Sequence, residues 1–286
     1  MPIIAPKLEI IEAPSQNYDD RRRPIRFCVL HYTGMENQED ALRVLRFPTP
    51  IYPRQPEPPP ENLDAETHDA PIVAPAALTP IGYRRVSSHY LVFTDGRIFS
   101  LVPENKRAWH AGAGSYGGET DMNSASIGIE IHNGGHDFGL PPFPDVQITS
   151  VMALVQGIKL RHGLDKQHVI GHSDWAPGRK LDPGERFPWE RLAHEGISLH
   201  IPNGEGDGNH QMLAQTENAT NEFVTRAQIG LRKIGYGLAQ TDIYDTKTKD
   251  TIIAFQRRFR QADVGGNLDV ETLAKIERLA NIVSPS

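Results

Sequence analysis

The sequence predicts an α/β fold in which helices flank a central mixed β-sheet, followed by a small C-terminal domain of three helices. Three observations support this prediction. Short apolar runs bounded by turn residues indicate strands in the first two thirds of the chain. One long amphipathic helix lies among them, at residues 145–164. Three further helical patterns follow one another near the end of the chain, with a polar stretch before them.

Changes of composition divide the 286 residues into four parts. Residues 1–24 are an extended lead-in, and residues 25–200 form the first domain. The Gly- and Asn-rich stretch at residues 201–220 is typical of a linker, and residues 221–286 form the helical domain. The first domain also contains a Pro-rich insertion at residues 48–80, which cannot form a helix or a central strand.

Two predicted strands carry titratable side chains. The run "IRFCVLHYTG", at residues 25–34, is typical of a buried strand and has His31 near its end. In "SIGIEIHN", at residues 126–133, the isoleucines share one face of the strand and Glu130 lies on the other. A buried glutamate is costly unless it is paired or functional, so Glu130 is a candidate site residue.

The other elements of the first domain are read from turn and helix signals. The pattern "NQEDALRVLRF" indicates a short helix at residues 37–47. Asp95-Gly96 is a strong hairpin turn between two β-rich runs. The helix at residues 145–164 has an apolar stripe and ends at Gly163, and "HVIGH" at residues 168–172 reads as a short strand.

The C-terminal section is predicted to form three helices and to contain little reactive chemistry. We expect them at Val224–Ile234, Thr246–Phe259 and Val270–Val283. With few candidate catalytic side chains in view, this domain is more typical of a binding or packing module than of a second active site.

Composition excludes several classes of protein. The chain is 38% hydrophobic and 23% charged, as in soluble globular proteins, and its net charge of −6 argues against nucleic acid as the main partner. The one cysteine, Cys28, excludes an intrachain disulfide framework and a Cys-rich zinc cluster. No apolar run reaches the length of a transmembrane helix, and the absence of a secretory signal predicts a cytoplasmic protein.

The segment "GHSDWAPGRKLDPG", at residues 171–184, is the densest in titratable groups. A catalytic zinc ion typically has three protein ligands of His or carboxylate type and one open position. His31 and His172, each at the end of a predicted strand, are two candidate ligands. Asp174 and Asp182 both remain candidates for the third, because spacing alone does not choose between them.

Metal-assisted hydrolysis also needs a base and a positive charge for the developing oxyanion. Glu130 and Lys180 are the candidates for these two roles. Taken singly, a strand-end histidine or an Asp-Pro-Gly turn is usually structural. A metal site is favoured because His31, His172, Glu130 and the Lys180–Asp182 segment all lie on predicted strands or in the loop after one, where they could meet in a single site.

Four motifs in order resemble the zinc-dependent N-acetylmuramoyl-L-alanine amidases. They are "VLHYTG", "SSHYLVFTDGRIFSLVPENKRAWHAG", "NSASIGIEIHN" and "VIGHSDWAPGRKLDPGERFPW". The resemblance runs from about Ile25 to Trp189 and implies the fold of the peptidoglycan recognition proteins. It also implies one catalytic zinc, with His31, His172 and Asp182 as ligands and Asp174 in a supporting role.

The same resemblance assigns the other site residues. Glu130 matches the family's general base, and Lys180 matches the lysine that stabilises the tetrahedral intermediate. Trp109 and His110, in "AWHAG", are expected to line the substrate cleft. The reaction implied is hydrolysis of the amide between N-acetylmuramic acid, or its 1,6-anhydro form, and L-alanine of the peptidoglycan stem peptide.

The last section resembles the small helical peptidoglycan-binding domain of wall hydrolases, through "LRKIGYGL", "IYDTKTKDTIIAFQRRF" and "GNLDVETLAKI". Peptidoglycan or a muropeptide is therefore the expected partner. A wall-binding domain favours a periplasmic or cell-wall-associated location, in contrast to the missing signal peptide. Two alternative functions remain: a non-catalytic peptidoglycan receptor on the same fold, and a zinc peptidase that cuts within the stem peptide.

Overall fold

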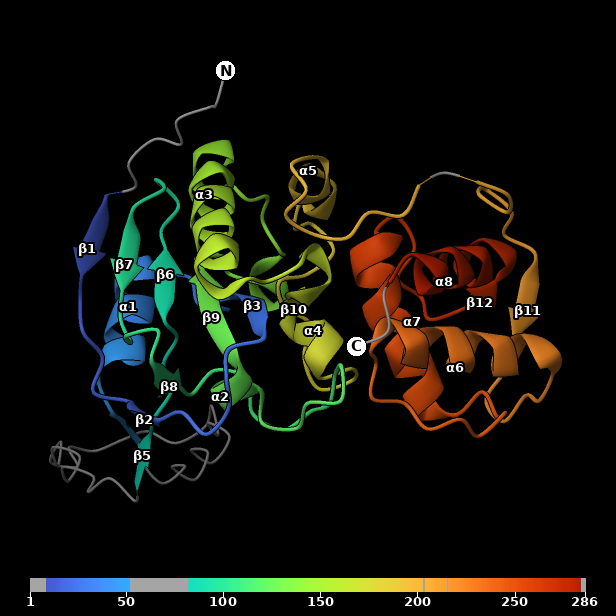
Figure 1. Cartoon of the computed structure of the whole chain (residues 1–286), viewed down its shortest axis with the longest axis horizontal. Helices are drawn as coiled ribbons and strands as arrows, with labels where there is room; N and C mark the ends of the chain where they lie inside the picture. Colours follow the sequence, from blue (N-terminus) through green and yellow to red (C-terminus); the bar gives the residue numbers. More distant parts are fainter. Residues whose placement is uncertain (1–8, 52–81, 203, 215, 284–286) are drawn as a thin grey trace, which may run out of the picture.

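The computed structural model describes residues 9–51, 82–202, 204–214 and 216–283. A six-stranded sheet lies at the centre of the first domain, with helices on its faces (Figure 1). Its strands are β1 (Ile10–Glu12), β3 (Phe27–Tyr32), β6 (Tyr90–Val92), β7 (Ile98–Ser100), β9 (Ser126–Ile131) and β10 (Val169–Gly171). Their order is β1-β7-β6-β9-β3-β10. The predicted mixed sheet is confirmed, because β7 is antiparallel to β6 while the other pairs are parallel.

Part of the predicted lead-in belongs to the sheet. β1 pairs with β7 at the sheet edge, and β2 (Tyr18–Asp20) pairs with β8 (Lys106–Ala108) in a separate ribbon. The sequence did not indicate β1 or β2. Each has only three residues, none of them buried, so neither shows the alternation that marks a half-buried strand.

Two helices cover opposite faces of the sheet. α3 (Asp145–His162) packs Ile148, Val151 and Val155 against the isoleucine face of β9. α1 (Gln38–Arg46) lies over β6 and β7 on the other face, where Leu45 joins the apolar cluster. Both predicted helices are confirmed, and α3 ends at Gly163 in a left-handed conformation, as its sequence indicates.

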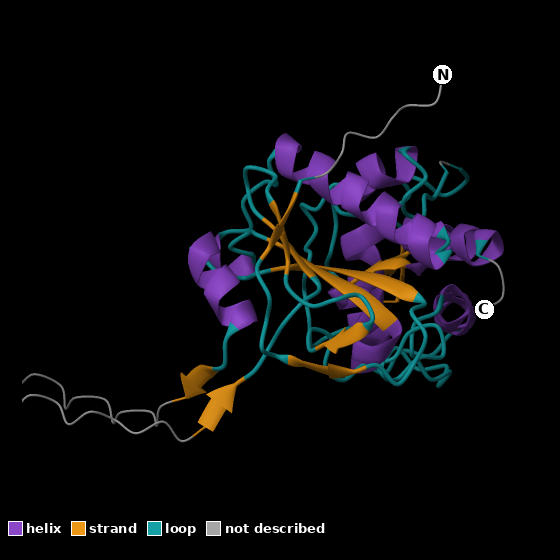
Figure 2. Ribbon diagram, turned by 60° about the vertical axis from the view of Figure 1, so that its left-hand side comes forward, coloured by secondary structure: helices purple, strands orange, loops and turns teal. Residues whose placement is uncertain are grey.

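Several short elements connect the sheet to the functional loops. β4 (Thr49–Ile51) and β5 (Gly82–Arg84) form an antiparallel ribbon that projects from the domain (Figure 2). They flank residues 52–81, so most of the predicted Pro-rich insertion lies outside the described residues. The short helices are α2 (Met122–Ala125), α4 (His172–Trp175) and α5 (Trp189–His194), with 3-10 turns at His136–Phe138 and Lys166–His168.

Three helices form the C-terminal section, as predicted: α6 (Glu222–Ile234), α7 (Thr246–Phe259) and α8 (Val270–Ile282). A short ribbon ties the predicted linker to them, because β11 (Met212–Ala214) pairs with β12 (Leu268–Asp269). Within the described ranges, none of the helices combines the length and hydrophobicity that crossing a bilayer requires.

The C-terminal helices share a hydrophobic core with the sheet domain. One continuous cluster joins Phe27 of β3 and Trp175 of α4 to Tyr236, which follows α6, and to Phe255 of α7 and other residues of the C-terminal section. α7 lies next to α4 in Figure 1. The helical section is therefore packed onto the part of the sheet domain that carries the titratable loop.

Candidate metal centre

Strand register brings the predicted site residues to one edge of the sheet. His31 of β3 lies directly opposite Glu130 of β9, and both are near the carboxyl ends of parallel strands. On the other side of β3, Gly171 of β10 pairs with Leu30, so His172 follows at the same edge. Neighbouring strands are about 4.8 Å apart, and ligand sites of α/β sheets commonly lie at the carboxyl ends of the strands.

Three ligand atoms converge at this edge. His31 Nδ1, His172 Nδ1 and Asp182 Oδ2 lie 2.9 Å from one another in every pair. The three side chains are buried, with residue exposures of 1%, 3% and 6%. Among the His, Cys, Asp and Glu side chains of the described residues, these three lie close enough together to hold a metal ion.

Hydrogen bonds fix the protons of His172. Its Nε2 lies 2.8 Å from the carbonyl oxygen of Ala111, which can only accept. Nε2 therefore carries the proton and donates it, and the Nδ1 of the neutral ring presents a lone pair to the cluster. The same carbonyl accepts from the indole N–H of Trp175 and the guanidinium of Arg179, so its position is well determined.

A chain of three residues fixes the protons of His31. Ser126 gives its hydroxyl proton to the Met122 carbonyl, so its oxygen accepts from His110 Nε2, 3.2 Å away. His110 Nδ1 is then an acceptor and takes a proton from His31 Nε2 at 2.9 Å. The Nδ1 of His31 is consequently left with a lone pair as well.

The donor set fits a cation. Two imidazole lone pairs and one carboxylate oxygen meet at 2.9 Å with no proton to share, so a positive ion between them is needed to satisfy all three. Burial and the His172 ring lower the pKa of His31 to about 4, which keeps it neutral.

Glu130 and Lys180 face the same cavity as the ligands. The cavity has a volume of about 470 Å³, and every predicted site residue except Asp174 lines it. Glu130 Oε2 is buried and has no hydrogen-bond partner among the described residues. Burial and the nearby Asp182 raise the pKa of Glu130 well above its usual value, while Lys180 opposes that rise. A buried carboxylate oxygen left free at a cavity wall is available for a reacting group.

The two residues expected to bind substrate have additional partners. Trp109 lines the cavity and donates its indole N–H to Asp19 of β2 at 2.9 Å. Both ring nitrogens of His110 are engaged by His31 and Ser126, so this ring supports a metal ligand as well as lining the cavity. Nothing in the motif "AWHAG" indicated that His110 would contact His31.

Asp174 does not join the ligand cluster. Its carboxylate is bound by Arg258 of α7, Tyr236 and the backbone N–H of Gly171, at 2.8, 2.6 and 2.8 Å. Asp182 is therefore the third member of the cluster that could hold a metal ion, and tertiary contacts decide the choice that residue spacing left open.

Other cavity-lining residues were not identified from the sequence. Tyr32 and His136 both line the cavity and contact each other, with the Tyr32 hydroxyl 3.0 Å from His136 Nδ1. Arg179 also lines it. A histidine within the Gly-rich run "NGGHDFG", directly after a strand, was the available signal for His136.

The sequence profile of the N-acetylmuramoyl-L-alanine amidases matches residues 21–185. This chain belongs to that family. The profile of a peptidoglycan binding domain matches residues 220–276, over the C-terminal helices of the amidase. The resemblance found in the sequence and the expected class of enzyme are thereby confirmed.

Individual relatives agree with this assignment. The amidase is 33% identical to the N-acetylmuramoyl-L-alanine amidase AmiD of Escherichia coli over 216 residues, or 71% of this chain and 77% of AmiD. It is 41% identical over 108 residues to the 1,6-anhydro-N-acetylmuramyl-L-alanine amidase AmpD of Haemophilus influenzae, spanning 37% of this chain and 56% of AmpD.

Solved structures extend the likeness across both parts of the chain. The complex of Escherichia coli AmiD with anhydro-N-acetylmuramic acid-L-Ala-D-γ-Glu-L-Lys superposes with a TM-score of 0.69 at 26% identity, covering 95% of this chain and all of AmiD. AmpDh3 of Pseudomonas aeruginosa, in complex with an anhydromuramic pentapeptide, superposes with a TM-score of 0.67 at 28% identity, covering 91% and 92% of the two chains.

Proposed function

We propose that this amidase uses one zinc ion to hydrolyse the amide between N-acetylmuramic acid, or its 1,6-anhydro form, and L-alanine of the stem peptide. The observation that carries the proposal is the convergence of His31 Nδ1, His172 Nδ1 and Asp182 Oδ2 beside a cavity that also holds Glu130. Family membership supports the choice of metal and of the bond that is cut. The anhydro-muropeptide substrate in the AmiD complex gives further support for the same bond.

His31, His172 and Asp182 would hold the zinc ion. When bound, zinc supplies Lewis acidity, which makes a water molecule a better nucleophile and polarises a carbonyl group. Two neutral imidazoles and one carboxylate leave a divalent ion with a net charge of about +1, which favours an anionic transition state.

Glu130 is proposed as the general base and acid. Its free Oε2 faces the cavity, so it can take a proton from the attacking water as the new C–O bond forms. The same carboxyl group then returns that proton to the amine nitrogen as the C–N bond breaks. The products are the lactyl carboxylate of the sugar and a stem peptide with a free L-alanine amino group.

Lys180 is proposed to stabilise the oxyanion. It is half-buried and lines the cavity, and its ammonium group makes no ion pair with another described residue. A cation that is not neutralised by a fixed carboxylate is available for charge that develops on the substrate carbonyl oxygen. Trp109 and His110 are proposed to form part of the wall against which the substrate lies.

We also propose a division into a catalytic domain at residues 25–200, a linker at 201–220 and a wall-binding domain at 221–286. The limits of the two family matches, 21–185 and 220–276, support these boundaries. Binding of the intact protein to sedimented sacculi at zinc concentrations that do not permit turnover would test the wall-binding role, and recovery of all the protein in the supernatant would contradict it.

The deciding experiment compares purified sacculi with soluble anhydro-muropeptides. Each substrate is incubated with the enzyme, with the enzyme plus a chelator, and with the chelated enzyme after zinc is restored. Mass spectrometry should then detect stem peptides with a new L-alanine amino terminus, lost on chelation and restored by zinc. Cleavage inside the stem peptide would instead indicate a peptidase, and binding without cleavage a receptor.

A further inference from the structure

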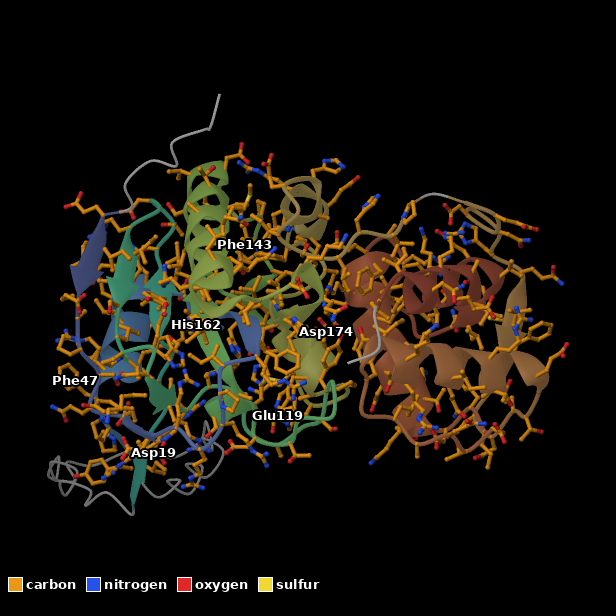
Figure 3. All side chains as sticks on the ribbon, in the orientation of Figure 1. Asp19, Phe47, Glu119, Phe143, His162 and Asp174 are labelled. Atoms are coloured by element: carbon orange, nitrogen blue, oxygen red, sulfur yellow. The ribbon has the colours of Figure 1, made fainter. Side chains whose placement is uncertain are left out.

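One helix of the C-terminal section contacts the whole length of the loop that carries two metal ligands. We name residues 172–185 the ligand loop, since it includes His172 and Asp182. Consecutive arginines of α7 reach its two ends: Arg258 binds Asp174, and Arg257 binds Glu185. Figure 3 labels Asp174 at the boundary between the sheet domain and the C-terminal helices.

The contact at the start of the ligand loop is fully buried. Arg258 Nη1 lies 2.8 Å from Asp174 Oδ2, and the two side chains are 2% and 1% exposed. The Tyr236 hydroxyl donates to the other carboxylate oxygen at 2.6 Å. Arg258 Nη2 also donates to the Val169 carbonyl of β10 at 2.7 Å. The guanidinium group of Arg258 thus connects β10, which precedes His172, to the turn that follows His172.

Asp174 transmits this restraint to both ligands in the loop. Its carboxylate accepts the Gly171 N–H at 2.8 Å and so fixes the first turn of α4, where His172 lies. In the same turn, the backbone N–H of Ser173 donates to the carbonyl oxygen of Asp182 at 2.9 Å. A shift of Asp174 would therefore move His172 and Asp182 relative to His31, which is fixed separately in β3.

The contact at the end of the ligand loop leads into the cavity. Arg257 Nε and His136 Nε2 both lie 3.1 Å from Glu185 Oε2, three residues after Asp182. His136 in turn contacts the Tyr32 hydroxyl, and both of these side chains line the cavity. Arg257 thus acts on the cavity wall through Glu185.

The middle of the ligand loop is held by close packing. Gly178 lies so near α7 that a Cβ atom there would come 2.2 Å from Asp250 Oδ2. Beyond the loop, the Gln261 amide donates to the Phe187 carbonyl at 2.7 Å. α7 therefore touches the loop at its start, middle and end.

We propose that Tyr236, Arg257 and Arg258 are positioning residues for the metal centre, so that tight metal binding depends on the C-terminal helices. This role is separate from any binding of wall polymer, and it rests on the proposed function only for its activity readout. Residues that orient metal ligands from outside the coordination sphere typically contribute 10–100-fold to metal affinity or activity. Because Tyr236 and Arg257 act one step further away, we expect about tenfold or less for each.

The decisive variants are Tyr236→Phe and Arg257→Gln, each in the full chain. Tyr236→Phe keeps the ring that packs on Tyr116 and removes only the hydroxyl. Arg258→Gln is less informative, because it leaves a buried carboxylate without its cation and destabilises the fold. The matched control is Arg226→Gln in α6, whose ion pair with Glu277 at 2.8 Å lies entirely within the C-terminal helices.

Two measurements need no substrate. Zinc dissociation constants are obtained by competition with a chromogenic chelator, and hydrogen exchange of residues 171–185 is followed in the metal-free protein. We expect an approximately 3- to 10-fold weaker zinc affinity and faster exchange in this segment for both variants. The Arg226→Gln protein should stay within about twofold of wild type in both measurements.

Activity assays then separate this proposal from the proposed function. With anhydro-muropeptides at limiting zinc, kcat should fall for both variants, and excess zinc should restore most of it. Folded variants with wild-type zinc affinity and unchanged exchange would overturn the positioning role, even if wild type is an active amidase. An inactive wild type would refute the amidase assignment, while the zinc and exchange data would still decide the positioning role.

Discussion

The proton on one ring nitrogen decides what His31 can bind. His31 donates from Nε2 to His110 Nδ1 at 2.9 Å, so its lone pair is on Nδ1 and points toward His172 and Asp182. The Ala111 carbonyl does the same for His172. Each of these two candidate metal ligands is therefore oriented by a neighbour that would not itself contact the ion.

Replacing His110 by Ala should weaken metal binding. The substitution leaves the Nε2–H of His31 without an acceptor in a buried site and frees the ring to change its tautomer. We expect a zinc dissociation constant about 10–100-fold higher, measured by chelator competition. His110→Asn places an amide oxygen near the former Nδ1 and should recover part of the affinity. Equal affinities for wild type and His110→Ala would remove His110 from the supporting role.

Replacing Glu130 by Gln should separate catalysis from metal binding. The amide has the same size but cannot accept the proton of the attacking water, and general acid–base catalysis typically contributes about 10²–10⁴-fold. We therefore expect kcat on anhydro-muropeptides to fall by about that factor, with zinc content near one ion per chain by elemental analysis. Retained turnover in the zinc-loaded variant would exclude Glu130 as the base.

At the scale of elements, strand pairing gives the site its geometry. β3, β9 and β10 are parallel neighbours, so their carboxyl ends present His31, Glu130 and His172 along one edge. Parallel strands share this edge because they run in one direction, and backbone hydrogen bonds fix their register. The ligand loop after β10 then passes through α4 and returns Asp182 to the same edge.

Adding one methyl group to β9 should disturb this arrangement. A Cβ on Gly128 would lie 2.6 Å from Cγ of His110, so the His110 ring would have to move. We expect Gly128→Ala to lower the free energy of unfolding by about 1–3 kcal/mol in urea titrations. The control is Gly82→Ala in β5, where a Cβ meets nothing within 4 Å, and its effect should stay within about 0.5 kcal/mol. Similar effects for both variants would contradict the close approach.

At the scale of the whole molecule, ion pairs and hydrogen bonds of charged groups connect elements that are distant in sequence. Glu104 follows β7 and binds Arg161 and His162 at the end of α3, and it accepts from the Tyr90 hydroxyl. Burial alone would raise the pKa of Glu104, but these three partners lower it to about 2. Its stabilising effect is therefore complete above pH ~4.5 and is lost as the pH falls toward 2.

Replacing Glu104 by Gln should accordingly change the acid stability of the protein. A pKa lowered from 4.5 to about 2 corresponds to about 3 kcal/mol of folding free energy. We expect Glu104→Gln to be less stable than wild type by roughly this amount at pH ~6, and the difference should vanish near pH ~2. Urea titrations at several pH values measure it. A difference that does not depend on pH would mean that Glu104 acts through packing and not through its charge.

The sheet domain and the C-terminal section, which the sequence suggested were separate, share one hydrophobic core. A polar, Gly-rich stretch suggested an independent C-terminal domain, yet one hydrophobic cluster runs from Phe27 of β3 to Phe255 of α7. The apolar faces of α6, α7 and α8 could be read from their 3.6-residue period, but that period does not say which partner covers them. β1 and β11 were not predicted for a similar reason: both are largely exposed, so they lack the buried apolar residues that mark a strand in the sequence.

The sequence by itself determined the α/β class, the long helices, the strands that carry His31 and Glu130, and the candidate ligands His31 and His172, because these depend on local periodicity and on residues at strand ends. The tertiary structure decided the rest. It brought Asp182 to His31 and His172, as the family resemblance had implied, bound Asp174 to Arg258, and set His110 behind His31. These outcomes depend on which groups meet across 10, 84 and 79 positions of sequence, and only packing and register fix such distances.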